Sequence, residues 1–397
     1  MDFSERLEIL GKQAVDELES NILEFWSEKM YDERNGGYLG SVNFDNQPDF
    51  NAAKGGILNA RILWTFSSAE LFLKNGKYRP FADRAFQYIE EFFVDKEYGG
   101  LYWLVSPEGK PLDLRKQVYL VAFGIYSYSE YYKLSADRNA LKRAIEFFHL
   151  VEDHSRDRLL GGYIEALDWQ WKPIGDMRLS DKDLNAPKTM NTHLHILEAY
   201  TNLYRVWPDE LLGKALEDLV RIFLDKFVAG GNTLKLFFDP EWNSLKNTTS
   251  FGHDIEFTWL LTESAHVLGK TSLIRECGET AVRIAGSVAE NGMDGDGGIM
   301  YEYDHDTGDL HTDKHWWPQS EALVGYLNAW KISGDPIFIE HALKSWEFIR
   351  QHVIDHENGE WHNELTRDRK VIPGLEKAGF WKCPYHNSRA MMEVARM

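Results

Sequence analysis

Stretches in which apolar residues recur every three or four positions fill most of the chain, and short polar segments separate them. This spacing is typical of helices that pack along one face. The stretches come in pairs with short connections, which predicts helical hairpins. They cover residues 5–28, 57–73, 80–93, 116–133, 137–152, 189–206, 209–227, 255–268, 272–289, 317–333 and 336–353, and a last one starts at 387. The pattern predicts about twelve helices in an all-α protein.

A short glycine-containing unit stands between the predicted hairpins and recurs about every 62 residues, with one double interval. The copies are Asn35-Gly-Gly-Tyr-Leu-Gly, Tyr98-Gly-Gly-Leu-Tyr-Trp, Gly161-Gly-Tyr-Ile-Glu, Gly297-Gly-Ile-Met-Tyr-Glu and Asn358-Gly-Glu-Trp-His-Asn-Glu, with a degenerate Gly230-Gly-Asn-Thr-Leu in the double interval. Glycine adopts the dihedral angles that tight turns need, so these units predict turns and short strands. The chain then consists of about six repeats.

Six helical hairpins cannot each bury an apolar face alone. A toroid of inner and outer helices buries all of these faces, whereas a linear solenoid, the alternative, leaves its end repeats exposed. We therefore predict an (α/α)6 barrel that forms one catalytic domain over residues 1–397, with the glycine units as short strands and hairpins in the rim loops.

Charge and composition narrow the possible partners. The formal net charge of −19 disfavours nucleic acid and anionic membranes, because phosphate binding needs clustered lysine and arginine. No stretch reaches the about 18 apolar residues of a membrane span, and the start shows no signal-peptide core. Cys277 and Cys383 lie outside any CxxC pattern, which predicts reduced packing residues. We expect a cytoplasmic enzyme.

Aromatic residues make up 14% of the chain and include 14 tryptophans. Sugar-binding clefts use such rings, because the apolar face of a pyranose stacks on them while its hydroxyls bind polar groups. His315-Trp316-Trp317-Pro-Gln-Ser-Glu321 places two rings ahead of a helix, with Glu321 one turn after Trp317 as a polar anchor. Trp381 adds a third ring near the end of the chain. Core packing is the alternative for Trp316 and Trp317.

Polar candidates lie mainly at the starts of alternate predicted helices. Arg61 stands in an otherwise apolar helix, where a guanidinium needs an anionic or hydroxyl-rich partner. A structural ion pair is the alternative for Arg61. Tyr119 occupies a similar helix and would be a core residue on its own. Asn191 and His195 are four apart and share a helical face, whereas His193 points elsewhere, which disfavours a metal site there.

Two histidines indicate proton transfer. His253 lies three residues before Glu256 at a helix start, where the carboxylate could hold the imidazole in one tautomer. His386 stands in Trp381-Lys-Cys-Pro-Tyr-His386-Asn-Ser-Arg389. Aromatic, imidazole and guanidinium groups are rarely so concentrated at the end of a chain. No serine, cysteine or metal motif accompanies them, so acyl transfer and metal-dependent hydrolysis are disfavoured. A pair of imidazoles suits epimerisation beside a carbonyl.

Several of these motifs resemble the cellobiose 2-epimerase family, a branch of the N-acylglucosamine 2-epimerase superfamily. The resemblance runs in order over nearly the whole chain. It is carried by Arg61-Ile-Leu-Trp, Met190-Asn-Thr-His-Leu-His-Ile-Leu-Glu-Ala-Tyr, Phe251-Gly-His-Asp-Ile-Glu, Trp316-Trp-Pro-Gln-Ser-Glu-Ala and Trp381-Lys-Cys-Pro-Tyr-His-Asn. It implies an (α/α)6 barrel and cofactor-free, metal-free 2-epimerisation of the reducing-end glucose in β-1,4-linked disaccharides such as cellobiose, lactose or mannobiose.

The resemblance also implies roles for individual residues. His253 and His386 match the family's acid/base pair, one on each face of C2, and His195 matches a histidine that assists ring opening. Polar residues match groups around O1 and O2 of the sugar, and these are Arg61, Tyr119, Asn191 and Glu256. Trp317 and Trp381 would stack on the sugars, with Trp316 and Glu321 beside them. Asp183 aligns with a loop carboxylate near the second sugar.

One position departs from the family pattern, because Ser388 replaces the glycine usual in its His-Asn-Gly-Arg ending. A positive φ there would strain serine, whereas a helix start would accept it. We expect activity to survive.

Other functions stay open at this stage. A monosaccharide mannose 2-epimerase or an aldose–ketose isomerase would use the same enediol. A glycoside hydrolase of the same fold would need an acid pair, which the sequence does not clearly offer. A non-catalytic sugar-binding module is a third possibility. We expect an oligosaccharide-binding monomer.

Overall fold

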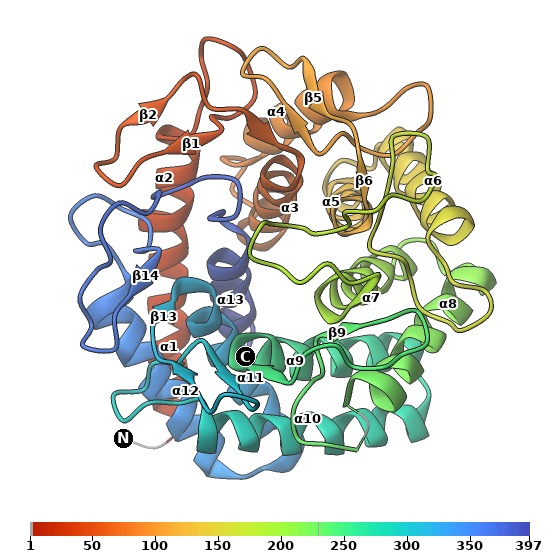
Figure 1. Ribbon diagram of the computed structural model, residues 1–397. Coiled ribbons are helices and arrows are strands. Elements are labelled where there is room, and N and C mark those ends of the chain that lie inside the picture. The colour runs from red at the N-terminus through yellow and green to blue at the C-terminus, as the bar shows by residue number, and fades with distance from the viewer. Residues whose placement is uncertain (1–2, 229) are drawn as a thin grey trace.

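Six helices that are buried on nearly every side form the inner ring of a barrel (Figure 1). They are α3 (Gly56–Leu73), α5 (Val118–Ser135), α7 (Met190–Tyr204), α9 (Phe251–Leu268), α11 (Trp316–Ser333) and α13 (Tyr385–Ala395). The computed structural model describes residues 3–228 and 230–397. In these helices apolar and small polar residues occur all round, because each helix packs against two ring neighbours and the outer layer. The fold is the (α/α)6 barrel that the sequence predicts.

Amphipathic helices form the outer ring. Several end in π-helical turns, labelled η. The outer elements are α1 (Phe3–Glu17) with η1 (Leu18–Ile22) and α2 (Leu23–Glu28), α4 (Arg79–Tyr88) with η2 (Ile89–Phe93), α6 (Arg138–His154), α8 (Glu210–Ile222) with η3 (Phe223–Val228), α10 (Thr271–Asn291), and α12 (Pro336–Phe348) with η4 (Ile349–Val353). In α8, Leu212, Leu216 and Leu219 are buried while Leu211 is exposed, as expected for one apolar face.

The C-terminal helix closes the inner ring. Neighbouring inner helices pack in chain order from α3 to α13, and α13 packs back against α3. The first helix, α1, lies against α13 from outside. The end of the chain is therefore fixed between the first repeat and the fifth, which explains how a terminal segment can hold a precise geometry. No helix within the described ranges is both long and apolar enough to span a bilayer.

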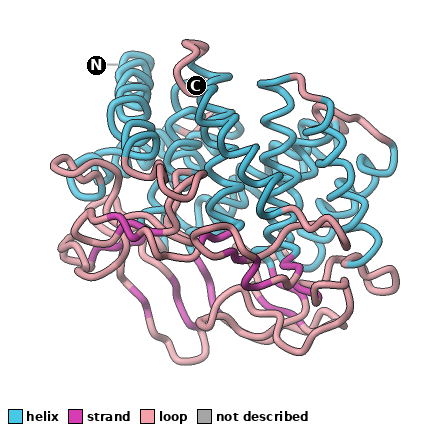
Figure 2. The backbone as a smooth tube through the Cα atoms, turned by 90° about the horizontal axis from the view of Figure 1, so that it is seen from above, coloured by secondary structure: helices cyan, strands magenta, loops and turns pink. Residues whose placement is uncertain are grey.

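Short antiparallel strands and long loops gather at one end of the barrel (Figure 2). The strands are β1 (Ser41–Val42), β2 (Pro48–Asp49), β3 (Lys54–Gly55), β4 (Leu104–Val105), β5 (Pro111–Asp113), β6 (Lys116–Gln117), β7 (Ala166–Leu167), β8 (Lys188–Thr189), β9 (Phe237–Phe238), β10 (Thr248–Ser250), β11 (Glu302–Asp304), β12 (Leu310–His311), β13 (Lys314–His315) and β14 (Glu364–Leu365). A strand precedes each of the inner helices α3 to α11 and pairs with a later rim strand, for example Lys54 with Val105. This pairing fixes the start of each inner helix.

The glycine units are tight turns on this rim. Gly36 and Gly37 both have positive φ, and a Cβ on Gly37 would lie 2.5 Å from the Tyr88 ring, so only glycine fits there. A buried lysine on the way to the inner helix binds an aspartate of the turn in most repeats. These pairs are Lys54–Asp32, Lys116–Asp95, Lys188–Asp157, Lys314–Asp296 and Lys377–Asp355. Each pair ties one turn to one inner helix.

Two expectations about helix starts are refined. The fourth inner helix begins at Phe251 rather than at residue 255, so His253 lies in the first turn of α9. Ser388 lies inside α13, where its Oγ donates to the Pro384 carbonyl and lies 3.3 Å from Thr65 Oγ1. Its backbone is helical and shows no positive φ, so the serine is accommodated without strain.

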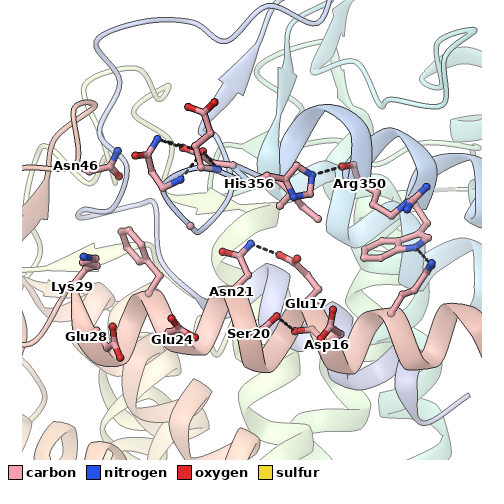
Figure 3. Close-up of a pocket in the computed structure, with 18 residues that line it drawn as sticks. Asp16, Glu17, Ser20, Asn21, Glu24, Glu28, Lys29, Asn46, Arg350 and His356 are labelled. Carbon is pink, nitrogen blue, oxygen red and sulfur yellow. Dashed lines mark hydrogen bonds between the residues drawn. The ribbon is translucent and has the colours of Figure 1, made fainter.

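A cavity of about 760 Å³ lies outside the barrel, where α1–α2 meet α12 and η4 (Figure 3). It contains none of the candidate site residues. One of its carboxyls, Glu17, accepts hydrogen bonds from Asn21 Nδ2 at 2.6 Å and from Trp361 Nε1 at 2.8 Å. Burial raises the pKa of Glu17 to about 7, although both hydrogen bonds lower it. This carboxyl is therefore a pH-sensitive contact in the seam that closes the outer ring.

Replacing Glu17 by glutamine should raise the melting temperature above pH 7. A carboxyl with a raised folded-state pKa stabilises the protein below its ordinary value near 4.5, and this stability is lost as pH rises through 7. The loss is at most about 3.5 kcal/mol, at about 1.4 kcal/mol per pKa unit. Melting curves at several pH values compare the variant with wild type. Glu24→Gln, an exposed position on the same cavity, is the control and should not flatten the profile.

Candidate active site

A cavity of about 590 Å³ opens among the starts of the inner helices and the rim loops. It brings together eleven of the twelve residues that the sequence analysis singled out. These are Arg61, Tyr119, Asp183, Asn191, His195, His253, Glu256, Trp316, Trp317, Trp381 and His386. The twelfth, Glu321, lies directly behind His386. Residues far apart in the chain therefore meet here because every inner helix starts at the same rim.

His386 lies in the first turn of α13 and is supported by a carboxylate. Its Nδ1 lies 2.7 Å from Glu321 Oε1 and 3.8 Å from Glu256 Oε1. Where Nδ1–H donates this hydrogen bond to Glu321 Oε1, Nε2 keeps a free lone pair. Burial, followed by Arg61 and Arg389, lowers the pKa of His386 well below its usual range. His386 is therefore a neutral imidazole whose protonated form the carboxylate would stabilise.

His253 has a different partner from the one predicted. Its Nδ1 lies 2.8 Å from the Oγ of Ser250, and Glu256 does not hold this imidazole. The expectation of a His253–Glu256 pair was wrong, because Glu256 instead accepts a hydrogen bond from Arg389. Burial lowers the pKa of His253 to about 3. His253 is therefore neutral as well, but it has a hydroxyl and not a carboxylate behind it.

Trp317 contacts both imidazoles. Its ring centroid lies 4.7 Å from that of His253 and 5.5 Å from that of His386. Gly252 makes this packing possible, since a Cβ there would lie 2.5 Å from the indole. Trp317 and Trp381 remain partly exposed in the cavity, whereas Trp316 is buried. Two of the three predicted rings can therefore meet a ligand directly.

Arg61 is a buried cation surrounded by rings and a thiol. Its Nη2 donates to the Tyr119 hydroxyl at 2.6 Å and its Nη1 to Cys383 Sγ at 3.5 Å, while Nε has no partner. Among the described residues no carboxylate lies within ion-pair distance of it. The alternative of a structural ion pair is therefore excluded for this part of the chain. An uncompensated guanidinium at a cavity wall stabilises an anionic group there.

The remaining predicted polar residues line the same cavity. His195 Nδ1 lies 3.0 Å from Glu198 Oε2, and its ring packs edge-on against Tyr119. Asn191 has an amide oxygen with no partner, so it is free to bind a ligand hydroxyl. Asp183 stands in a rim loop, where one carboxylate oxygen accepts hydrogen bonds from the Ser180 amide and hydroxyl.

Arg389 connects the carboxylates beneath the cavity. Its Nη2 donates to Glu256 at 2.8 Å and to Glu321 at 2.7 Å, and its Nη1 donates to Glu198 and to the Tyr385 hydroxyl. Glu321 in turn binds His386, and Glu198 binds His195. One buried guanidinium thus orients two histidines through their carboxylates. Arg389 belongs to the C-terminal motif that contains His386, but the sequence alone predicted no role for it.

Glu256, Glu321 and His386 also have the spacing of a metal site, with ligand atoms within 4.8 Å of one another. The same Oε1 atoms of both carboxylates already accept hydrogen bonds from Arg389. A divalent cation between them would lie against this guanidinium. Charge repulsion therefore disfavours a metal, and the residues fit a hydrogen-bonded network better.

Other residues of the site were not predicted, some despite a local signal and some because their partners lie far away in sequence. Ser250 behind His253 could have been found, since a hydroxyl three residues before a histidine at a helix start is a local signal. Glu198 could also have been found from its spacing of three after His195. Tyr385 and Glu360 show no local signal, because Tyr385 contacts Glu198 and Glu360 contacts Trp26, which belong to other repeats. Lys382 contacts Glu360 across 22 residues of the same repeat.

Known proteins of one family are similar to this chain over nearly its whole length. The family model of N-acylglucosamine 2-epimerase (GlcNAc 2-epimerase) matches residues 37–390. A cellobiose 2-epimerase of Bacteroides fragilis is 45% identical over 98% of this chain and 99% of its own. One from Ruminococcus albus is 39% identical over 95% of this chain and 96% of its own. The solved cellobiose 2-epimerase of Bacillus thermoamylovorans superposes with a TM-score of 0.93 at 37% identity, covering 98% and 99% of the two chains.

The barrel fold and these similarities define an enzyme of the isomerase class, a carbohydrate epimerase. The chain belongs to the N-acylglucosamine 2-epimerase family.

Proposed function

We propose that this protein inverts C2 of the reducing-end glucose in β-1,4-linked disaccharides, converting cellobiose to glucosyl-mannose and lactose to epilactose. The observation that carries the proposal is the placement of two neutral imidazoles, His253 and His386, against one tryptophan ring in the cavity. The names of the relatives, which are cellobiose 2-epimerases, supply the substrate class. We also propose that residues 1–397 form one catalytic domain and that the protein acts as a monomer.

Ring opening is the first step. The hemiacetal must lose its O1 proton and the ring oxygen must gain one, which yields the aldehyde. His195 is suited to this transfer, because it reaches the cavity while Glu198 holds its Nδ1 at 3.0 Å. Asn191 and Tyr119 line the same wall and would bind the hydroxyl groups at this end of the sugar.

Removal of the C2 proton forms a cis-enediolate. The electron pair of the C2–H bond becomes the C1–C2 double bond, and negative charge moves to O1. His386 suits the base for the glucose form, because Glu321 stabilises the imidazolium that results. Arg61 lies in the cavity wall without a carboxylate partner, so its charge would stabilise the enediolate oxygen.

Return of a proton to the opposite face completes the inversion. Rotation about C2–C3 presents the other face of C2 to His253. While the negatively charged enediolate is bound, His253 takes up a proton from solvent and then donates it to C2. The low pKa of His253 makes its imidazolium a strong donor. For the mannose form the two histidines exchange roles, as microscopic reversibility requires.

Stacking and one loop carboxylate would hold the disaccharide. Trp317 lies beside both imidazoles, so a ring stacked on it would place C2 near them. Trp381 lies on the same cavity and would support the sugar from another side. Asp183 is partly exposed in its rim loop and would accept a hydrogen bond from the second sugar.

Incubation with cellobiose in heavy water should place deuterium at C2 and leave the glycosidic bond intact. Proton transfer through imidazoles that exchange with solvent requires this incorporation. Mass spectrometry and proton NMR of the recovered disaccharides measure it. Release of free glucose would contradict the proposal and favour a hydrolase, and inert binding would favour a sugar-binding module.

A parallel incubation with mannose separates the related activities. Turnover of mannose alone would replace the disaccharide assignment with a monosaccharide 2-epimerase or, if fructose forms, an aldose–ketose isomerase. Disaccharide epimerisation, monosaccharide epimerisation and aldose–ketose isomerisation all pass through an enediol. Deuterium exchange at C2 therefore does not distinguish them, whereas the identity of the product does. Disaccharide turnover without monosaccharide turnover supports the proposal.

A further inference from the structure

The sixth repeat has a glutamate where the other rim turns have glycine. The equivalent position is Gly37, Gly100, Gly162 and Gly298 in the first, second, third and fifth units. A Cβ at any of these four would meet a side-chain atom within 2.9 Å. In the sixth unit this residue is Glu360, which is fully buried and has a φ of +61°. A left-handed backbone strains a non-glycine residue, so the contacts of the Glu360 side chain must offset this strain.

The Glu360 carboxylate binds the segment that carries His386. Its Oε2 accepts a hydrogen bond from the buried ammonium of Lys382. Its Oε1 accepts one from Asn387 Nδ2 at 2.5 Å and one from Trp26 Nε1 at 3.3 Å. Lys382 and Asn387 lie on either side of His386 in the sequence, so one carboxylate holds both flanks of a site histidine.

Lys382 belongs to an extension that the first, second, third and fifth repeats lack. In the first, second, third and fifth repeats the inner helix begins two residues after the buried lysine, as Gly56 follows Lys54. In the sixth, Lys377 forms the usual pair with Asp355, but α13 begins only at Tyr385. The intervening residues carry Trp381 and Lys382. The second lysine, Lys382, and the glutamate in place of glycine, Glu360, therefore occur in the same repeat. In this repeat a longer segment leads from the first lysine to the inner helix.

The ion pair also reaches the cavity wall. Lys382 lines the cavity, and its Nζ lies 4.2 Å from the centroid of the Trp316 ring. That ring lies edge-on to His386, with centroids 5.4 Å apart. The charge of Lys382 therefore holds one face of the indole against which His386 packs. Glu360 in turn keeps the ammonium in place.

We propose that the buried pair of Glu360 and Lys382 positions His386 and the Trp381-bearing extension for catalysis, and that its main role is not to stabilise the barrel. Glu360 is a positioning residue, since it acts through Lys382, Asn387 and Trp316. The proposal rests on the proposed function, because epimerisation is the activity that reports on His386. Displacement of a reacting group by about 1 Å can lower turnover about 100-fold.

The test removes both charges at once with Glu360→Gly and Lys382→Met in one variant. Glycine restores the residue found in the other turns and relieves the positive φ, and methionine fills the space of the lysine stem. Replacing a buried ion pair by apolar groups often leaves stability unchanged. We expect a melting temperature close to wild type, a fall in kcat of about 10- to 100-fold, and a much smaller change in KM.

A ratio separates mispositioning from loss of folded enzyme. In heavy water, the amount of deuterium exchanged at C2 of recovered substrate is divided by the amount of epimer formed. This ratio does not depend on the folded fraction, and a displaced His386 should change it. Glu360→Gln keeps the shape of the side chain but loses its charge, and it should change the exchange ratio in the same direction by a smaller amount. This single variant tests the proposal if the double variant folds poorly.

The matched control is the lysine–aspartate pair of the first repeat, changed as Lys54→Met with Asp32→Asn. This pair is equally buried but contacts no residue flanking His386. It should leave both kcat and the exchange ratio unchanged. The inference would be overturned if the Glu360 variants kept the kcat and the exchange ratio of wild type. It would also be overturned if the control variant changed both quantities as much as the Glu360 variants do. Absence of epimerisation in wild type would instead refute the proposed function.

Discussion

Replacing His386 by asparagine should lower the kcat of epimerisation by about 10²- to 10⁴-fold, the usual contribution of a general acid or base. Asparagine is polar and can fill part of the imidazole site beside Glu321, but it cannot transfer a proton at neutral pH. His253→Asn should cause a loss of the same order. Progress of cellobiose epimerisation, followed by chromatography of the two disaccharides, measures both effects.

The two single variants should also differ in what they retain. If His386 removes the C2 proton of the glucose form, His253→Asn should still exchange that proton with heavy water while forming little epimer. His386→Asn should lose this exchange and keep exchange on the mannose form. Near-normal epimerisation in either variant would refute the two-histidine mechanism. His356→Asn, at an exposed histidine outside the barrel, is the control and should behave as wild type.

Replacing Arg389 by methionine should damage both stability and catalysis. The change leaves three buried carboxylates, those of Glu198, Glu256 and Glu321, without their shared cation. Removal of one partner from a buried ionic network costs about 3–5 kcal/mol. Because His195 and His386 are oriented through two of these carboxylates, kcat should also fall by about 100-fold. Thermal melting and steady-state kinetics measure the two losses.

The pH profile distinguishes the charge of Arg389 from its geometry. Burial, Arg61 and then Arg389 lower the pKa of His386, so loss of the Arg389 charge raises that pKa. A base with a raised pKa becomes protonated at higher pH, and the acidic limb of kcat should therefore shift upward in Arg389→Met. Arg389→Lys keeps the charge but not the two-pronged geometry, so it should lose kcat with little shift of the limb.

Arg396, near the end of the same helix, provides the control for this substitution. It pairs with Glu393 on the surface, where an ion pair contributes about 0–1 kcal/mol. Arg396→Met should leave melting temperature, kcat and the pH profile nearly unchanged. Wild-type activity in Arg389→Met would show that Arg389 does not orient the histidines.

The helical hairpins could be predicted because their signal is local. Apolar spacing within each stretch and the glycine units between them are sufficient to give the repeat count and the barrel. The start of α9 was missed by four residues, because Gly252 in its first turn is a poor helix former. The structure keeps that glycine for a tertiary reason, since the Trp317 ring lies where its Cβ would be.

The site was predictable in composition but not in pairing. Its residues lie at the starts of inner helices or in the loops before them, and this common feature was visible in the repeats. The partner of His253 was assigned wrongly, because a spacing of three in sequence does not exclude competition from elsewhere. Arg389, more than a hundred residues later, binds Glu256, and Ser250 contacts His253 instead.

The sequence by itself determined the number of repeats, the barrel class and the inventory of histidines, tryptophans and polar groups, because helical periodicity and turn residues act over a few positions. Only the tertiary structure decided that Glu321 supports His386, that Arg389 joins three carboxylates, and that Glu360 holds the C-terminal segment. These contacts arise when the ring closes between α13 and its neighbours, and no local pattern records which distant side chains then meet.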